Sequence, residues 1–416
     1  MTMDPTRIEP SSAEVAPRRF PLIAGADGRR VVLIAVHHVR VDGTTYTGGA
    51  EKYIQTVIPA LIDAGASVHV GYSGSSVYDD LLERYHPKQL TVEKTDWLSE
   101  VLAGDREIGL SLVLDRIRWF RATHADTALF VQQASGSAYS ASVLAARLAR
   151  LRVVSSLRQP PAPIPESQAG RIAGVIPRPG LWRRRALRRH RFPASLSHTL
   201  IYNSERVADD YERMYAFSPA KRRVVYNGVV VSDAPGRRAI THRIASVGRL
   251  TEAKGADQLL EAFERVARED AEATLTYFGD GPLVEPLRRR SAEMGLSDRV
   301  RFAGFVSDRD AIYTDIDIYV HASQRESMSN SVIEAMGRGI PCVVTDVGGM
   351  REAIVDGACG LVVSSGDVDA LAGAILRLLR ERALYDTCAA GATARAREVF
   401  DERANMELMV QAVLGL

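Results

Sequence analysis

The sequence predicts an α/β fold of two domains, each with a parallel sheet covered by helices on both faces. Its 416 residues, 46% of them hydrophobic, are more than one ordinary core accommodates. Short apolar runs also alternate with helix-like segments twice along the chain, which is the pattern of parallel strands joined by crossover helices. Two doubly wound units joined by a linker are therefore expected.

The first unit is expected to span residues 29–228, after a disordered tail at residues 1–28. Its apolar runs lie at 31–36, 68–70, 128–131, 151–155, 199–202 and 223–226. A loop with Gly48 and Gly49 and a helix at 50–64 follow the first run, which makes a βαβ start. Such a loop lies where doubly wound sheets bind ligands, although the glycine pair alone fits an ordinary turn equally well.

The second unit is expected at residues 241–400, after a linker at 229–240. Its apolar runs lie at 243–247, 275–278, 300–302, 316–320, 341–345 and 360–363. Two Rossmann-like domains of this kind would face each other across a cleft at the carboxyl ends of their strands. An amphipathic helix at 401–416 ends the chain and is expected to pack back on either unit.

Composition excludes several classes of protein. The formal net charge of +2 gives no electrostatic case for nucleic-acid binding. Cys342, Cys359 and Cys388 lack CxxC spacing, so we expect three reduced thiols in a cytoplasmic protein. No apolar run is long enough for a membrane span. Asp315 and Asp317 form a DxD pattern that suits a metal, but the pattern runs into a strand, so we expect a capping role and no metal.

The segment from Glu326 to Glu334 is the most informative part of the chain. Eight helical positions span about 12 Å, so the two carboxylates are too far apart to touch and match the two ends of an extended nucleotide-sugar. Ser329, Asn330 and Ser331 lie between them and offer N-cap chemistry, while a helix start leaves backbone N–H groups that can hold a diphosphate. Two Glu at this spacing also arise by chance, so the surrounding motifs must decide.

Two cations follow a predicted strand end. Arg249 and Lys254 come two and seven residues after Val247, so both can reach into the cleft and neutralise a diphosphate. Gly248 permits close approach of the backbone to a ligand. On their own, these two residues are also consistent with a solvated pair at a helix entrance.

Five motifs in register resemble the retaining GT-B glycosyltransferases of the family 4 type, which include bacterial mannosyl- and glucosyltransferases. The motifs are Gly48-Gly49-Ala50-Glu51, Asn227-Gly228-Val229, Gly248-Arg249-Leu250 with Lys254-Gly255, Gly279-Asp280-Gly281-Pro282, and Glu326 to Glu334 with Ala335-Met336 and Gly348-Gly349. The resemblance covers residues 31 to 400 and implies that the first domain binds an acceptor and the second a nucleotide-sugar.

The resemblance also implies a role for each matching residue. Arg249 and Lys254 would hold the leaving diphosphate, with Gly48, Gly49 and Gly248 beside it, while Glu326 would bind the sugar hydroxyls, Glu334 the ribose and Val306 the nucleobase. Transfer would occur on the front face, with the departing phosphate oxygen accepting the proton of the acceptor hydroxyl.

One position departs from the family pattern. Many relatives carry a His after the strand that we place at 128–131, and here the residue is Gln132. Gln cannot act as a base, but its amide can bind a sugar hydroxyl, which favours proton transfer to the leaving group. His37, His38, His124 and His321 remain as candidates, although a lone His is more often structural.

A basic segment points to a surface. Arg183, Arg184, Arg185, Arg188 and Arg189 crowd together beside apolar residues, a composition that suits an anionic membrane surface. A solvated helix face is the main alternative, and a nucleic-acid patch a lesser one. The expected location is cytoplasmic or peripheral at the inner face of the membrane.

Together these features predict a retaining, metal-independent transferase without a cofactor. It would move a hexose from a UDP- or GDP-sugar to a hydroxyl of a carbohydrate or lipid-linked acceptor, in the synthesis of cell-surface polysaccharide or glycolipid. An epimerase or hydrolase acting on a nucleotide-sugar fits the same architecture, as does a non-catalytic nucleotide- or lipid-binding protein. A dinucleotide oxidoreductase is disfavoured because the first loop lacks the pyrophosphate fingerprint.

Overall fold

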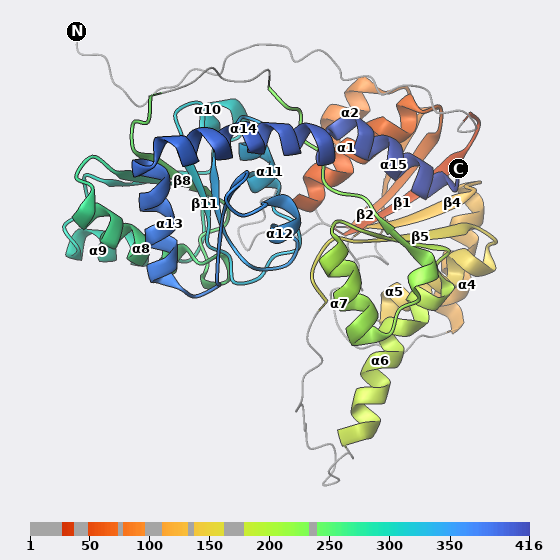
Figure 1. Cartoon of the computed structure of the whole chain (residues 1–416). Coiled ribbons are helices and arrows are strands. Elements are labelled where there is room, and N and C mark those ends of the chain that lie inside the picture. Colours follow the sequence, from red (N-terminus) through yellow and green to blue (C-terminus); the bar gives the residue numbers. More distant parts are fainter. Residues whose placement is uncertain are drawn as a thin grey trace.

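The computed structural model describes residues 27–36, 49–73, 78–95, 110–131, 137–161, 179–232 and 239–416. These residues contain two parallel sheets, one of seven strands and one of six, in two lobes that lie side by side (Figure 1). The predicted class of two Rossmann-like α/β domains is confirmed. Most of the predicted tail and residues 233–238 of the predicted linker lie outside the described part.

The N-terminal sheet has the strand order β3-β2-β1-β4-β5-β6-β7. Its strands are β1 (Arg30–Val36), β2 (Ser67–Ser73), β3 (Leu90–Lys94), β4 (Thr127–Val131), β5 (Arg152–Leu157), β6 (Thr199–Tyr202) and β7 (Arg222–Val224). Its helices are α1 (Gly49–Asp63), α2 (Asp79–Arg84), α4 (Leu110–Ala122), α5 (Ser137–Leu148), α6 (Pro179–Leu196) and α7 (Glu205–Tyr215). The strand order reverses between β1 and β4, and ligands of doubly wound sheets bind at such a switch point.

Strand β3 is absent from the sequence-based prediction. Leu90 is its buried residue, while Thr91, Glu93 and Lys94 are exposed. The strand lies at the edge of the sheet, where polar and charged residues face solvent. It therefore lacks the apolar run by which the central strands are recognised.

The C-terminal sheet has the strand order β10-β9-β8-β11-β12-β13. Its strands are β8 (Arg243–Val247), β9 (Thr274–Phe278), β10 (Val300–Gly304), β11 (Ile318–His321), β12 (Cys342–Thr345) and β13 (Gly360–Val363). Its helices are α8 (Ala256–Glu269), α9 (Val284–Glu293), α10 (Arg309–Tyr313), α11 (Asn330–Met336), α12 (Met350–Ala353), α13 (Val368–Arg380) and α14 (Arg382–Val399). Here the switch point lies between β8 and β11.

Strand β11 begins later than predicted, and Asp317 directly precedes it. Its carboxylate accepts hydrogen bonds from the backbone N–H groups of Thr241 and Arg243, at 2.8 and 2.9 Å. Asp315 lies 3.3 Å from the Arg243 guanidinium in an exposed ion pair. Asp317 therefore holds the start of β8, in line with the cap or strand-start role predicted for one of the two acids.

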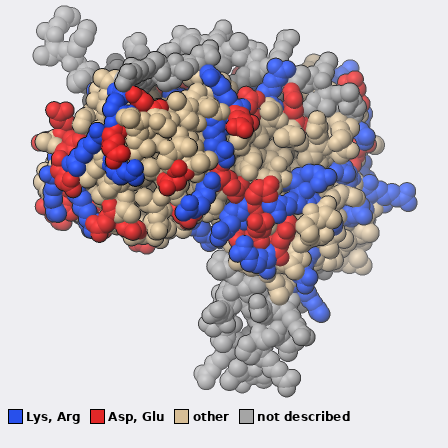
Figure 2. Space-filling model, viewed as in Figure 1, with Lys and Arg blue, Asp and Glu red and all other residues tan. Residues whose placement is uncertain are grey.

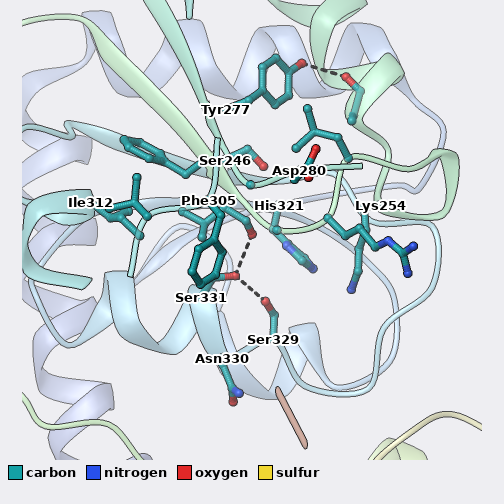
Figure 3. A pocket seen from close by; sticks show the side chains of 18 of the residues that line it. Ser246, Lys254, Tyr277, Asp280, Phe305, Ile312, His321, Ser329, Asn330 and Ser331 are labelled. Carbon is teal, nitrogen blue, oxygen red and sulfur yellow. Dashed lines mark hydrogen bonds between the residues drawn. The ribbon is translucent and has the colours of Figure 1, made fainter. Parts of the chain in front are cut away.

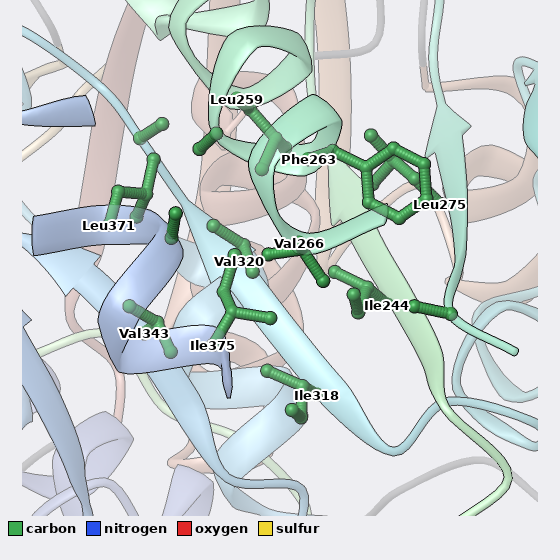
Figure 4. Packing of buried hydrophobic residues seen from close by; sticks show 14 of the residues in the cluster. Ile244, Leu259, Phe263, Val266, Leu275, Ile318, Val320, Val343, Leu371 and Ile375 are labelled. Atoms are coloured by element: carbon green, nitrogen blue, oxygen red, sulfur yellow. The ribbon is translucent and has the colours of Figure 1, made fainter. Parts of the chain in front are cut away.

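An apolar core on one face of the C-terminal sheet holds that sheet against α8 and α13. Phe263 and Val266 on α8 and Ile375 on α13 are fully buried, and they pack over Ile318 and Val320 of β11 (Figure 4). Burial of one such side chain contributes roughly 1.5–3 kcal/mol. The core fixes β8 and β11, whose carboxyl ends carry the pocket described below.

The chain passes between the two domains twice, and the two connecting segments lie side by side. Val229 forms a bridge with Asp401, and its N–H donates to the Phe400 carbonyl at 2.7 Å. A Cβ at Gly228 would overlap Glu402, so this position requires the smallest residue. Packing thus accounts for the Asn227-Gly228-Val229 motif, because the motif lets the two connecting segments come together.

The last helix, α15 (Glu402–Leu414), returns to the N-terminal domain and packs on α1, β4 and β6. Met409, Val410 and Val413 are buried there in the same core as α1. The Tyr53 hydroxyl lies 3.0 Å from the Met409 sulfur. Helix α15 is therefore built into the core of the N-terminal domain together with α1.

The surface charges and the cysteines agree with what the composition predicts. Acidic and basic side chains are intermixed on the face shown in Figure 2, in keeping with the small net charge. Cys342, Cys359 and Cys388 are free and buried, as predicted. In the part of the chain that the structure covers, no helix is both long and apolar enough to cross a membrane.

Replacing Met409 by Ala should lower the free energy of unfolding by about 2–5 kcal/mol, because it leaves a cavity in the N-terminal core. Leu408→Ala is the matched control, since Leu408 is 51% exposed and should cost less than about 0.5 kcal/mol. Urea unfolding measures both. Equal losses would show that α15 does not belong to this core.

Candidate functional site

A pocket of about 470 Å³ lies beyond the carboxyl ends of β8, β9 and β11 (Figure 3). It brings together many residues that the sequence singled out: Gly248, Arg249, Lys254, Val306, Glu326, Ser329, Asn330 and Ser331. Phe305, Arg309 and His321 also line it, and Lys52 reaches it from the other domain. The pocket therefore lies at the switch point of the C-terminal sheet and faces the N-terminal domain.

Glu326 is the buried acid of this pocket. Its Oε2 atom lies 2.5 Å from Lys254 Nζ and 3.3 Å from His321 Nε2, and its Oε1 atom accepts the Ser327 N–H at 3.0 Å. Burial raises the pKa of Glu326, but His321 and Lys254 together outweigh it and lower this pKa to about 2. The carboxylate is therefore ionised at neutral pH.

Backbone contacts hold Lys254 beside Glu326. The Ala253 carbonyl accepts hydrogen bonds from Gln324 N–H at 2.9 Å and from Ser323 Oγ at 3.0 Å. Gly255 has a φ of +65°, and a Cβ there would overlap the Ala322 carbonyl. The turn before α8 and the loop after β11 thus approach each other closely, which the Lys254-Gly255 motif allows.

A second glycine pair supports the Glu326 loop from the other side. Gly348 has a φ of +52°, and a Cβ there would overlap the Glu326 carbonyl. The Gly349 N–H donates to the Ser327 carbonyl at 2.6 Å. The Gly348-Gly349 motif therefore shapes the backbone that carries Glu326.

Glu334 lies inside α11 and is 3% exposed. Its carboxylate forms an ion pair with Lys52, accepts the Tyr313 hydroxyl at 3.1 Å and lies 3.4 Å from the Arg309 guanidinium. Lys52 comes from α1, so this ion pair joins the two domains. Sequence reasoning missed Lys52, although it directly follows the Gly48–Glu51 motif and is one of five lysines in the chain.

The start of α11 differs from the prediction. Ser329 is the N-cap residue, but its side chain makes no capping hydrogen bond. Its Oγ lies 3.0 Å from Ser331 Oγ, which in turn donates to the Val247 carbonyl at 3.3 Å. Asn330 Oδ1 accepts a hydrogen bond from Asn227 at 2.5 Å. The three polar side chains connect α11 to β8 and to the interdomain crossing.

The remaining residues predicted for the site lie in several different places. Gly48, Gln132, His37 and His38 lie outside the described residues, and Gly49 is the first residue of α1. His124 is exposed, in a turn, and does not line the pocket. His321 is 5% exposed and lies next to Glu326.

The domains also touch beside the Glu326 loop. Ser327 Oγ donates to the Arg158 carbonyl at 2.7 Å, and Arg325 donates to the Pro161 carbonyl at 2.9 Å. We call the contact of residues 158–161 with residues 325–327 the seam. At the start of α7, Glu352 accepts the N–H groups of Glu205 and Arg206, both at 2.8 Å.

Solved structures share this architecture. HepE of Anabaena, solved in complex with UDP, has a TM-score of 0.70 at 20% identity, covering 93% of this chain and all of that one. A glycosyltransferase of Rickettsia africae has a TM-score of 0.69 at 15% identity, covering 93% and 98%. The fold is therefore that of the GT-B glycosyltransferases.

Sequence comparison gives the family. Residues 47–233 match the model described as Glycosyltransferase Family 4, and residues 235–395 match Glycosyl transferases group 1. Both halves of the chain therefore match models of glycosyltransferases, and the resemblance to the family 4 type that the motifs predicted is confirmed.

Two curated relatives match this chain over less than half of their own length. The lipopolysaccharide core biosynthesis glycosyltransferase LpsE of Rhizobium meliloti is 33% identical over 141 residues, which is 34% of this chain and 40% of LpsE. Mannosylfructose-phosphate synthase of Agrobacterium fabrum is 32% identical over 187 residues, 41% of each chain. The chain thus spans less than half the length of either relative.

The ionised state of Glu326 predicts a pH dependence of stability. Because its folded pKa of about 2 lies below the ordinary value of 4.5, the carboxylate stabilises the fold above pH 4.5, and this contribution is lost as the pH falls through 2. Wild type should exceed Glu326→Gln by about 3 kcal/mol at pH 7, and the two should converge near pH 2. Urea unfolding at a series of pH values measures this.

Glu285→Gln on α9 is the control, because the Glu285 side chain is 69% exposed. Its unfolding free energy should stay within about 0.5 kcal/mol of wild type at each pH. A difference between wild type and Glu326→Gln that does not change with pH would contradict an ionised Glu326.

Proposed function

We propose that this protein transfers a hexose from a UDP- or GDP-sugar to an acceptor hydroxyl. The observation that carries the proposal is the buried, ionised Glu326 paired with Lys254 in a pocket that Arg249 also lines. HepE, which has the same fold, was solved with UDP and with UDP-glucose, and LpsE acts in lipopolysaccharide core synthesis. These comparisons support a nucleotide-sugar donor and a carbohydrate acceptor.

We propose that the donor lies in the pocket in one direction. Arg249 and Lys254 would hold the diphosphate beside Gly248, since guanidinium and ammonium groups both bind phosphate. The sugar would then lie against Glu326, and the nucleobase against Phe305 and Val306. Glu334 would bind the ribose and share its carboxylate with Lys52.

We propose that the reaction retains the configuration of the sugar and needs no metal. The bond from the anomeric carbon to the phosphate oxygen breaks, and the bond to the acceptor oxygen forms on the same face. The leaving phosphate oxygen takes the acceptor proton. Arg249 and Lys254 neutralise the charge that develops on this phosphate, while the Glu326 carboxylate stabilises the positive charge on the sugar ring.

We propose that α6 brings the protein to lipid-linked acceptors at an anionic membrane surface. The helix projects from the N-terminal domain (Figure 1), and Arg188 and Arg191 on it are exposed, with Phe192 at 40% exposure. The side chains of Arg183, Arg184, Arg185 and Arg189 lie outside the described part. This arrangement would place the protein at the inner face of the membrane.

Removing either cation should cost activity. Arg249→Ala and Lys254→Ala should each lower kcat/KM by roughly 100-fold, equal to about 3 kcal/mol per lost donor, and Glu326→Ala by a similar factor. Lys88→Ala, at an exposed position, should leave the rate unchanged. Turnover of UDP-glucose and GDP-mannose is followed by nucleotide release in the presence of EDTA.

The products decide between the candidate reactions. An α-linked product from an α-linked donor, formed only with acceptor and undiminished by EDTA, agrees with the proposal, and NMR of the anomeric proton reads the linkage. Nucleotide release without acceptor would indicate the hydrolase or epimerase instead. Near-normal turnover of both Lys254→Ala and Glu326→Ala would reject the site.

Charge reversal on α6 tests the surface contact. Arg188→Glu with Arg191→Glu should weaken binding to vesicles that contain phosphatidylglycerol by at least about ten-fold, because each basic residue near such a surface contributes about 1 kcal/mol. Arg118→Glu with Arg121→Glu on α4 is the matched control and should bind like wild type. Co-sedimentation measures both, and equal binding by the two double variants would contradict the α6 contact.

A further inference from the structure

His321 is a buried histidine of the pocket that the reaction described above does not use. It is the last residue of β11, is 5% exposed and lines the pocket. Its Nε2 atom is buried, lies 3.3 Å from Glu326 Oε2 and has no full hydrogen bond to any described residue. Of the described residues that contain such a buried unpaired atom, only His321 lines this pocket. A polar atom left in this state requires an explanation.

The strand directs the imidazole toward the carboxylate. Side chains along a strand alternate between the two faces of the sheet. Ile318 and Val320 point into the core beneath α8 and α13, so Tyr319 and His321 lie on the opposite face. The His321 ring and the Lys254 side chain reach into the same part of the pocket (Figure 3).

Lys254 and His321 compete for one oxygen atom of Glu326. The Lys254 Nζ atom lies 2.5 Å from Oε2, whereas His321 Nε2 lies 3.3 Å from the same atom. The other oxygen, Oε1, accepts the Ser327 N–H at 3.0 Å. The ammonium group thus occupies Oε2 in this structure, and the imidazole remains beside it without a hydrogen bond of its own.

A bound diphosphate would change this balance. In the proposed function Lys254 binds the diphosphate, so its ammonium group turns from Glu326 toward the ligand. A buried carboxylate that loses its cation is strongly unfavourable, and that cost would weaken diphosphate binding. The Nε2–H of a neutral or a protonated imidazole can donate to Oε2 in place of the ammonium group. His321 is therefore placed to remove this cost.

We propose that His321 is a positioning residue that takes over the Glu326 carboxylate when Lys254 turns to the diphosphate of the donor. This inference rests on the proposed function. The exchange keeps Glu326 ionised and in place beside the donor sugar, while Lys254 neutralises the leaving group. His321 acts through Glu326, because its Nε2 atom is buried and faces that carboxylate.

Calorimetric titration of the full chain with UDP and with GDP tests the exchange. His321→Gln and His321→Asn are a matched pair, because the Gln amide nitrogen lies close to the position of Nε2 and the shorter Asn does not reach it. His321→Asn should bind the nucleotide at least about ten-fold more weakly than wild type, since Lys254 then leaves a buried carboxylate unpaired. His321→Gln should retain most of the affinity.

The same titration in a Glu326→Gln background separates the exchange from other effects. A neutral amide needs no charged partner, so His321→Asn should not weaken nucleotide binding further in that background. An equal loss in both backgrounds, or no loss in either, would overturn the inference. Val320→Ala is the structural control, because Val320 is buried on the opposite face of β11. It should lose stability and keep the nucleotide affinity of wild type.

Unfolding in urea without ligand tests the contact independently of nucleotide binding. Lys254→Met removes the ammonium group from Glu326, as the diphosphate would draw it away. At pH 7, His321→Asn should lower the unfolding midpoint of Lys254→Met at least about twice as much as it lowers that of wild type, because Glu326 then has no other cation beside it. Equal losses in the two backgrounds would contradict the exchange. Failure of wild type to bind UDP and GDP would instead overturn the proposed function, and this comparison would still decide whether His321 can hold the carboxylate.

Discussion

The ion pair of Lys254 with Glu326 is the interaction on which the site depends. A buried carboxylate is unfavourable on its own, and it stays ionised here because Lys254 and His321 both lie against it. Removal of Lys254 would leave the buried Glu326 carboxylate without its ammonium partner, and an uncompensated buried charge is among the costliest defects in a protein. The loops around the pair must therefore approach closely and keep their shape, and glycines at 255 and 348 permit this.

Among the residues that the structure describes, the pocket is lined by four cations, Lys52, Arg249, Lys254 and Arg309, and by two acids, Asp280 and Glu326. This excess of cations complements the negative charge of the proposed nucleotide-sugar. Glu326 and Glu334 offset the charge of Lys52, Lys254 and Arg309. A diphosphate would compete for these cations, and sugar hydroxyls would then take up the carboxylates. Lys52, Lys254 and Arg309 thus each have a carboxylate partner before the proposed ligand binds.

Contacts across the cleft give the N-terminal domain a part in this pocket. Lys52 reaches Glu334, and Ser327 reaches the Arg158 carbonyl, so both ends of the Glu326 to Glu334 segment touch the other domain. The two connecting segments meet at Val229 and Asp401, which limits where a hinge can lie. Movement of the domains would therefore change the pairing of Glu334 with Lys52 and the contact of Ser327, which directly follows Glu326.

The sequence by itself determined the two α/β units, most of their central strands, and many of the residues that line the pocket. Long apolar runs and glycine motifs carry that information, because they are local. Tertiary structure alone decided the edge strand β3, whose residues are mostly polar, and the failure of Ser329 to cap α11, because its hydroxyl turns to Ser331. It alone also decided the pairing of Lys52 with Glu334 and the burial of Arg158, since contacts between residues hundreds of positions apart follow from packing and leave no pattern in the neighbouring sequence.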